Sequence, residues 1–185
     1  ESRIKDKYTL EQAIEQLNII KSLDHPNLVK IFEYYVDEYD FYIVSEYCEQ
    51  GDLFTNISNL DLSETMILQL IEQILNSLAY LNSKNILHGD LKVENILIDK
   101  RKNVLFHGKE MHYVEIKIID FAFSKIFKAN KINHESISSY IYCSPEVLKN
   151  VYDYRSDIWS LGVLMYLLLS SNLPFKGSNF DEIIA

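Results

Sequence analysis

Cysteine is scarce in this 185-residue sequence, and no hydrophobic run is long. Two cysteines, Cys48 and Cys143, cannot cross-link a fold of this size, which indicates a reducing compartment. The most apolar stretch, LGVLMYLLL at 161–169, is far shorter than the roughly 20 residues that a membrane-spanning helix needs. The N-terminal ESRIKDKYTL lacks the apolar core of a signal peptide. We therefore expect no membrane span and a cytoplasmic or nuclear location.

Positive charge is also in short supply. Lys and Arg together number 18 against 27 for Asp and Glu, which gives a formal net charge of −9. No basic cluster with interleaved aromatic residues occurs, so the sequence is a poor candidate for binding nucleic acid. An acidic chain is better matched to a cationic peptide partner.

Glycine and proline are sparse as well, with five and three residues. No linker rich in Gly, Pro or Ser and no internal repeat divides the chain. Hydrophobic residues make up 48% and charged residues 24%, as in an ordinary globular protein. The length suits one well-buried domain or most of a larger one.

Hydrophobic spacing predicts three long helices. The first covers residues 9–23, where Thr9 and Gln12 fit a capping box. In the second, Asp61 and Glu64 are expected to form the cap, and one face should be buried. The apolar positions of that face are 67, 68, 71, 74, 75, 78 and 81. The third, residues 156–171, is apolar nearly all round and should lie in the middle of a core.

Strands are predicted where β-branched and aromatic residues gather, at 28–36 and 41–48. NILID (95–99) and VEIKIID (114–120) predict two further short strands around a polar excursion, KRKNVLFHGKEMH. After Phe121 the sequence is polar and irregular up to 146, which predicts a loop. The expected layout is a small strand-containing start followed by a mainly helical body.

The stretch HGDLKVEN, residues 88–95, carries the groups that phosphoryl transfer needs. That reaction depends on positioning and on neutralising charge. Asp90 offers a carboxylate to orient an attacking hydroxyl and accept its proton, and Lys92 offers a cation near the phosphoryl group. Asn95 offers a neutral oxygen ligand for a metal ion. Alone, such a loop could equally be a surface turn.

Further pieces follow in a fixed order. IIDF (118–121) sets Asp120 directly after a predicted strand, where a carboxylate can reach Mg²⁺ on nucleotide phosphates while Phe121 packs inward. SPE (144–146) and SDIWSLG (156–162) come next. Each piece is weak by itself, but chance does not readily supply their order and separations together.

These motifs resemble those of eukaryotic protein kinases of the serine/threonine type. HGDLKVEN is similar to the catalytic loop, DFA (120–122) to the metal-binding DFG, and SPE to the APE that closes the activation segment. YIVSEYCEQGDLF and DYRSDIWSLGVLMYLLLSSNLPFKG look closest to the calcium/calmodulin-dependent and calcium-dependent kinases. The resemblance implies an α+β fold, with a partial small lobe at 1–47 and an incomplete, mainly helical large lobe at 48–185. We expect a piece of a longer protein.

The resemblance also implies roles for individual residues. Asp90 is expected to be the catalytic base, assisted by Lys92, and Asn95 and Asp120 to bind Mg²⁺. The other residues expected to contact ATP or a basic substrate are Ser45 at the gatekeeper position, Glu46 and Cys48 through backbone groups, Leu97 under the adenine ring, Asp52 at ribose or a substrate Arg, and Glu94. Asp157 is expected to brace the catalytic loop. Ile20, Ile31, His88 and Phe121 match a hydrophobic stack between the lobes.

The sequence departs from the kinase pattern at several points. It has no G-x-G-x-x-G and no V-A-I-K-like strand, because its glycines (51, 89, 108, 162 and 177) are scattered. Gln16 stands where kinases carry a Glu that pairs with the strand Lys. Gly89 replaces the Arg that reads activation-loop phosphate, so that phosphate should not be needed. Ala122 replaces the glycine of DFG and narrows the freedom of that turn.

The expected function is transfer of the ATP γ-phosphate to Ser or Thr of a protein or peptide with basic residues nearby. Gln16 and Ala122 leave open a pseudokinase that binds partners without transfer. HGDL followed by Asn also fits small-molecule kinases, although SPE and SDIWSLGV argue against them. A calcium-sensing segment is implied only by the resemblance, since these residues contain no EF-hand loop pattern.

Overall fold

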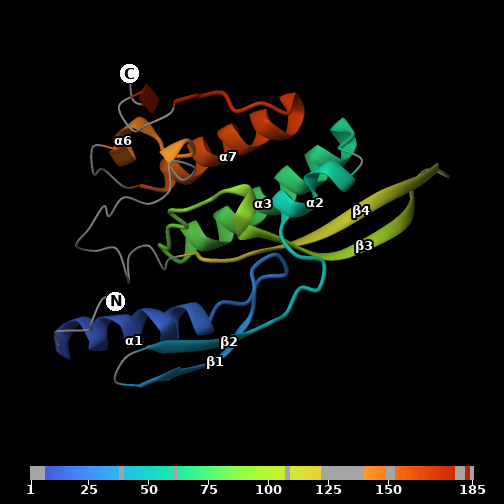
Figure 1. The fold of residues 1–185 in the computed structure, drawn as a ribbon. Helices are drawn as coiled ribbons and strands as arrows, with labels where there is room; N and C mark the ends of the chain where they lie inside the picture. The colour runs from blue at the N-terminus through green and yellow to red at the C-terminus, as the bar shows by residue number, and fades with distance from the viewer. Residues whose placement is uncertain are drawn as a thin grey trace.

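A computed structural model describes residues 7–37, 40–60, 62–106, 109–121, 140–148, 153–177 and 182–183. In Figure 1 helix α1 (Lys7–Lys21) and strands β1 (Ile31–Val36) and β2 (Phe41–Ser45) form a small lower part. The larger part contains helices α2 (Leu53–Asn56), α3 (Glu64–Ser83), α6 (Pro145–Leu148) and α7 (Tyr154–Ser170), the 3-10 turns η1 (Ile57–Asn59) and η2 (Val93–Asn95), and strands β3 (Ile96–Phe106) and β4 (Lys109–Ile118). The predicted α+β layout is confirmed; the lobe boundary after residue 47 stays a prediction.

The small part folds as its residue types dictate. Strands β1 and β2 pair antiparallel, from Ile31 opposite Ser45 to Val36 opposite Phe41. Helix α1 buries Leu17 and Ile20 and packs against β1. It begins at Lys7, ahead of the predicted start, and the side chains of Thr9 and Gln12 lie outside the described residues.

Helix α3 lies at the centre of the larger part, with one correction to its cap and one to its buried face. Ser63, which directly precedes the helix, accepts a hydrogen bond from the N–H of Met66, so it takes the capping role assigned to Asp61. The buried stripe includes Ile67, Ile71, Ile74, Leu78 and Leu81 as predicted. Leu68 and Leu75 are exposed, because the stripe runs instead through Met66, Leu70, Gln73 and Ser77.

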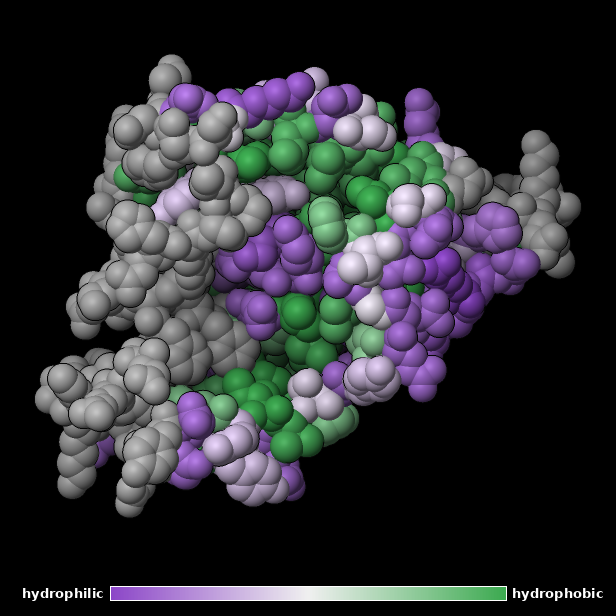
Figure 2. Space-filling view, in the orientation of Figure 1, coloured by the Kyte–Doolittle hydropathy of each residue, from purple (hydrophilic) through white to green (hydrophobic). Residues whose placement is uncertain are grey.

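The polar excursion is not a loop between two short strands. Residues 100–106 and 109–113 continue β3 and β4 as one antiparallel hairpin, with a bulge between Ile98 and Lys100. Figure 1 shows this hairpin projecting beyond the helices, and Figure 2 shows polar surface over it. Cross-strand pairs such as Lys102 with Glu115 satisfy its charged residues outside the core.

A buried polar joint connects the small part to β4 and α3. Ile118 donates its N–H to Asn27 O (2.8 Å), and Val29 donates to Ile118 O (3.0 Å). Gln73, 6% exposed, accepts from the Asn27 side chain (2.9 Å) and from Ile116 N (3.1 Å). It also donates to Val114 O at 2.8 Å. Each bond satisfies a polar group that burial would otherwise leave unpaired.

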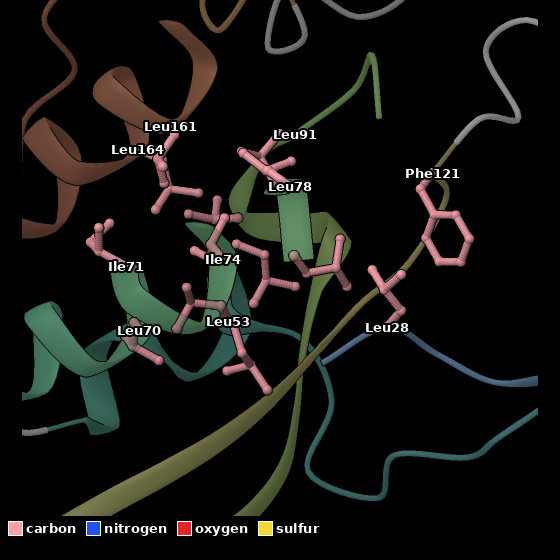
Figure 3. Packing of buried hydrophobic residues seen from close by; sticks show 14 of the residues in the cluster. Leu28, Leu53, Leu70, Ile71, Ile74, Leu78, Leu91, Phe121, Leu161 and Leu164 are labelled. Atoms are coloured by element: carbon pink, nitrogen blue, oxygen red, sulfur yellow. The ribbon is translucent and has the colours of Figure 1, made fainter. Parts of the chain in front are cut away.

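The core is one cluster of aliphatic and aromatic side chains. Figure 3 shows Ile71 and Ile74 of α3 facing Leu161 and Leu164 of α7, with Phe121 farther along the cluster. The apolar residues of helix α7 predict a place in the middle of the core, but Met165, Tyr166 and Leu169 are exposed. Among the described residues it packs one face on α3, and Figure 2 shows apolar surface at the place of this helix. None of the helices in the described ranges is long and apolar enough to cross a membrane.

Candidate active site

The loop that precedes β3 is held by helix α7. The carboxylate of Asp157, 5% exposed, accepts hydrogen bonds from the backbone N–H groups of His88 and Gly89, both at 2.9 Å. The expected contact between Asp157 and the loop is confirmed. Gly89 adopts a φ of +77°, a left-handed conformation in which a side chain is strained. Glycine therefore suits this turn beside a buried carboxylate.

Three of the predicted site residues, the catalytic Asp90 and Lys92 and the metal-binding Asn95, meet at the Asp90 carboxylate. Lys92 Nζ lies 2.9 Å from Asp90 Oδ2. Asn95 Nδ2 donates to the same oxygen at 3.1 Å and to the backbone oxygen of Asp90 at 2.8 Å. The side chain of Asn95 is buried, which fixes this arrangement by packing as well as by hydrogen bonds. A carboxylate, a cation and an amide oxygen are thus held within one short loop.

His88 is fully buried behind this loop. Its Nδ1 accepts a hydrogen bond from Asp90 N at 3.2 Å, which assigns the proton to Nε2. Within the described residues Nε2 has no hydrogen-bond partner. Burial lowers the pKa of His88, although the carboxylates of Asp157, Asp90 and Asp120 act in the opposite direction. The imidazole is therefore kept neutral inside the fold.

Asp120 comes two residues after β4 and is exposed. Its φ is +59°, a left-handed conformation that costs a non-glycine residue on the order of 1–2 kcal/mol. Such conformations persist where the surroundings hold them and cluster at functional sites. Here Phe121 is 1% exposed on one side, and Ile119 N donates to Asn95 O at 3.0 Å on the other. The turn therefore sets Asp120 beside Asn95.

The chemistry of this donor set fits a magnesium ion. The two hydrogen bonds from the Asn95 side chain use Nδ2, so Oδ1 is its atom for a cation. Amide and carboxylate oxygens are hard ligands, and Mg²⁺ commonly takes one or two protein oxygens and completes its shell with phosphate and water. Across the described ranges no group of three or more His, Cys, Asp or Glu could hold a metal ion by itself.

Three of the residues predicted to line the adenine site, Ser45, Glu46 and Cys48, lie at the end of β2 or just after it. Glu46 N donates to Lys30 O at 2.8 Å, so the carbonyl is the backbone polar group of Glu46 that this bond does not use. The Glu46 side chain turns away and meets Lys117 Nζ at 2.9 Å and Lys30 N at 3.2 Å. Ser45 is exposed, and its Oγ donates to Glu46 O at 3.4 Å. Cys48 is buried, and this burial is the main reason that the pKa of its thiol is raised.

Asp52 and Leu97 lie next to each other, as an isolated antiparallel bridge joins them. Asp52 caps α2 by accepting from Thr55 N at 2.7 Å. Gly51 O accepts from Ile98 N at 2.9 Å, which ties this segment to the start of β3. The residues predicted for ribose or substrate and for the floor of the adenine site are thus brought together.

Glu94 sits in η2 with one carboxylate oxygen, Oε2, buried and without a hydrogen-bond partner among the described residues. Burial, and next the charge of Glu94, raise the pKa of Tyr142 to about 12. A buried carboxylate oxygen without a donor is costly, so it favours a cationic ligand.

The remaining predictions have mixed outcomes. Ile20, Ile31, His88 and Phe121 are all buried, as the hydrophobic stack requires. Gln16 is half-buried on α1. Ala122 lies outside the described residues.

Comparison with known proteins identifies the family. The model of the protein kinase domain matches residues 1–185. This chain belongs to the protein kinase domain family. Calcium-dependent protein kinase 6 of Plasmodium berghei (strain Anka) is 40% identical over 91% of this chain and 11% of its own length. Calcium-dependent protein kinase 4 of Plasmodium falciparum (isolate 3D7) is 37% identical over 98% of this chain and 33% of its own length.

Solved kinase structures agree with this assignment. A crystal structure of Rad53 1-466 in complex with AMP-PNP has a TM-score of 0.73 and 29% identity, over 94% of this chain and 42% of that one. The Rad53 kinase domain with SCD2 gives a TM-score of 0.69 at 28% identity, over 97% of this chain and 60% of that one. The kinase domain sequence described here thus spans a third or less of these curated relatives and less than two thirds of the solved chains.

Sequence reasoning missed three residues that shape this kinase site. Lys117 holds Glu46, Asn56 holds the segment around Asp52, and Arg101 contacts Asn56. Lys117 and Arg101 act on residues far away in the sequence, whereas Asn56 acts on carbonyls four and six residues before it. The sequence offers only a weak indication for Lys117 and Arg101, namely that both are cations on strands of mixed polarity.

Proposed function

We propose that this kinase domain transfers the γ-phosphate of Mg-ATP to serine or threonine hydroxyls of protein substrates. The observation that carries the proposal is the grouping of Lys92 Nζ and Asn95 Nδ2 at 2.9 and 3.1 Å from Asp90 Oδ2. Phosphoryl transfer asks the protein mainly for such positioning and charge. Lys92, two residues after Asp90, is the arrangement that resembles serine/threonine kinases.

Each residue has a stated task in the proposed reaction. Asp90 orients the attacking hydroxyl and accepts its proton, and the Lys92 ammonium offsets negative charge on the phosphoryl group. Asn95 Oδ1 and the Asp120 carboxylate would hold Mg²⁺, which supplies Lewis-acid stabilisation of the phosphate charge. Asp157 and the neutral His88 keep the loop in register, since both bond its backbone. Backbone groups of Glu46 and Cys48, with Ser45 and Leu97, would receive the adenine.

We propose a basic peptide segment as the substrate. Support comes from the buried, unpartnered Oε2 of Glu94 and from the net charge of −9. The names of the relatives, calcium-dependent protein kinases, support calcium control through a regulatory segment outside these residues. With two cysteines in the sequence, the reaction is proposed for the cytoplasm or nucleus.

The test is phosphate transfer from Mg-ATP to an Arg-x-x-Ser peptide, measured with the purified protein and its natural flanking sequence, with calcium and with a chelator. Asp90→Asn is the control because it keeps the shape but removes the base. Transfer that is lost in Asp90→Asn supports the proposal, and transfer that needs calcium supports the regulation. An Arg-x-x-Tyr peptide phosphorylated instead would reject the serine/threonine assignment.

One observation favours a second candidate, a pseudokinase that binds partners. Gln16 provides a neutral amide where kinases carry a Glu, so an ion pair would be replaced by a hydrogen bond. A folded protein that gives no transfer under all these conditions would favour this candidate. Gln16→Glu would then be the variant to assay first.

A further inference from the structure

The segment that carries Asp52 is held at three successive backbone carbonyls. Asn56 Nδ2 donates to Gln50 O at 2.7 Å and to Asp52 O at 2.9 Å. Between them, Gly51 O accepts from Ile98 N at 2.9 Å. Gly51 has a φ of +75°, so the chain turns sharply at this point. One side chain, Asn56, therefore controls both carbonyls that flank the turn.

The carboxylate of Asp52 depends on this turn for its direction. Its Oδ1 accepts from Thr55 N at 2.7 Å and caps α2, which leaves Oδ2 as the oxygen for a ligand. A hydrogen-bond acceptor that is fixed before the ligand arrives costs less to order on binding. The turn and the cap together supply this pre-ordering.

Asn56 is in turn held by the hairpin. Arg101, on β3 and opposite Val114, donates from Nη2 to Asn56 Oδ1 at 2.5 Å. An amide side chain has one acceptor end and one donor end, so a guanidinium at the oxygen directs the NH₂ group toward the carbonyls. Across the described ranges the Arg101 side chain has no carboxylate partner, and the bond to Asn56 is its only side-chain hydrogen bond. The Arg101 guanidinium therefore bonds the Asn56 side-chain amide and no other side chain in the described part of the protein.

We propose that Arg101 is a positioning residue that acts through Asn56 to hold Asp52 for its ligand. The proposal rests on the proposed kinase function for the identity of that ligand, a hydrogen-bond donor on ribose or on a substrate Arg. Arg101 itself touches neither. Through Asn56, Arg101 links the projecting hairpin to Asp52. The predicted reaction assigns no role to that hairpin.

The test compares Arg101→Met with Arg101→Lys and with Lys102→Met. Lysine can still donate to Asn56 Oδ1, whereas methionine cannot. Lys102 is the matched control, because it is the next residue on β3 and pairs with Glu115 instead. Two comparisons of kcat and KM are measured for each variant. The first sets ATP against 2′-deoxy-ATP and 3′-deoxy-ATP. The second sets an Arg-x-x-Ser peptide against the same peptide with norleucine in place of Arg.

We expect Arg101→Met to raise the KM for either ATP or the peptide by about three- to tenfold, which is the effect of losing one ordinary hydrogen bond. The kcat should stay within about twofold of that of the unaltered protein. The preference for ATP over a deoxy nucleotide falls if Asp52 contacts ribose, and the preference for the Arg peptide falls if it contacts substrate. Arg101→Lys should restore most of the preference, and Lys102→Met should keep it. Unchanged preferences in Arg101→Met would overturn the proposal.

Two further measurements separate this proposal from the proposed function. Amide hydrogen exchange at Thr55 and Ile98 should be faster in Arg101→Met than in Lys102→Met, with or without catalysis. If the parent protein transfers no phosphate, the kinase proposal fails while exchange still decides whether Arg101 holds the segment. Asn56→Ala combined with Arg101→Met should cost no more than Asn56→Ala alone, because the two act in series. Additive effects, or unchanged exchange, would show that Arg101 does not act through Asn56.

Discussion

Lys117 Nζ lies 2.9 Å from Glu46 Oε2, and this ion pair joins β4 to the segment after β2. Both side chains are largely shielded, with exposed fractions of 14% and 27%. Because Glu46 Oε2 also accepts from Lys30 N, the carboxylate fixes the backbone that is predicted to receive adenine. The pair therefore helps to hold the backbone around Glu46 in place.

We expect Lys117→Met to lower the free energy of unfolding by about 1–3 kcal/mol, because the shielded Glu46 carboxylate would lose its cationic partner and keep only the hydrogen bond from Lys30 N. It should also raise the pKa of His25, since the charge of Lys117 adds to burial in lowering it. Urea unfolding and an NMR titration of His25 measure the two effects. Lys102→Met, which breaks a more exposed pair, should change unfolding by less than about 1 kcal/mol. Equal losses in both variants would contradict the prediction.

Asp157 supports the catalytic loop through two backbone N–H groups, and its replacement should be costly. In Asp157→Asn one oxygen becomes an NH₂ group that faces a backbone donor of His88 or Gly89. We expect a loss of about 1–3 kcal/mol in unfolding free energy and a fall in kcat at least as large as the fall in kcat/KM for ATP. Asp153→Asn, at the cap of the same helix, is the control for damage to α7 alone. A normal kcat in Asp157→Asn would argue against this positioning role.

Burial of neutral His88 predicts a pH dependence of stability. The pKa of His88 in the fold is lowered below its unfolded value of about 6.5, so the unfolded chain binds more protons between the two values. The stabilisation is complete above about pH 6.5 and is lost, at up to about 1.4 kcal/mol per pH unit, as the pH falls toward the folded pKa. Urea unfolding at about pH 7.5 and about pH 5.5 measures this loss.

In His88→Asn the loss between these pH values should shrink, because the titrating group is gone. His25→Asn is the matched comparison, since the pKa of His25 is also lowered but its side chain is less buried. We expect a smaller change there. The same pH dependence in His88→Asn as in the unaltered protein would rule out His88 as its source.

The local chemistry of the site could be predicted because it lies within short stretches of sequence. Asp90, Lys92 and Asn95 are close along the chain, and the loop needs only one turn to bring them together. The strands at β1 and β2 could be predicted from their β-branched and aromatic residues, and α1 from its apolar spacing.

The rest depends on partners that are distant in the sequence. The residues KRKNVLFHGKEMH look like a loop because their charged side chains show no clean alternation, yet cross-strand pairs such as Lys102 with Glu115 satisfy them in a hairpin. The buried face of α3 was shifted because Gln73 and Ser77 are inside, and hydropathy alone assigns polar residues to the surface. Nothing local indicates that Gln73 bonds the backbone of Val114 and Ile116.

The buried side-chain amide of Gln73 leads to a further prediction. Gln73→Met fills a similar volume but leaves Val114 O and Ile116 N without their side-chain partner in the core. We expect a cost of about 1–3 kcal/mol for each group that no water reaches. Gln69→Met, one turn earlier on α3, is the control, because its Oε1 already lacks a partner among the described residues. Urea unfolding should separate the two variants, and equal stability would mean that the joint relaxes without cost.

Glu94 gives the sharpest test of substrate choice. Its Oε2 is buried without a hydrogen-bond partner in the described part of the chain, so a guanidinium from a substrate would relieve a cost already present in the free protein. Glu94→Gln should therefore lower kcat/KM for an Arg-x-x-Ser peptide by about tenfold or more, equal to about 1.4 kcal/mol. A peptide with norleucine in place of Arg should be affected little. Glu64→Gln, exposed at the start of α3, is the control for charge loss in general. Equal losses with both peptides would mean that Glu94 supports the loop and does not read the substrate.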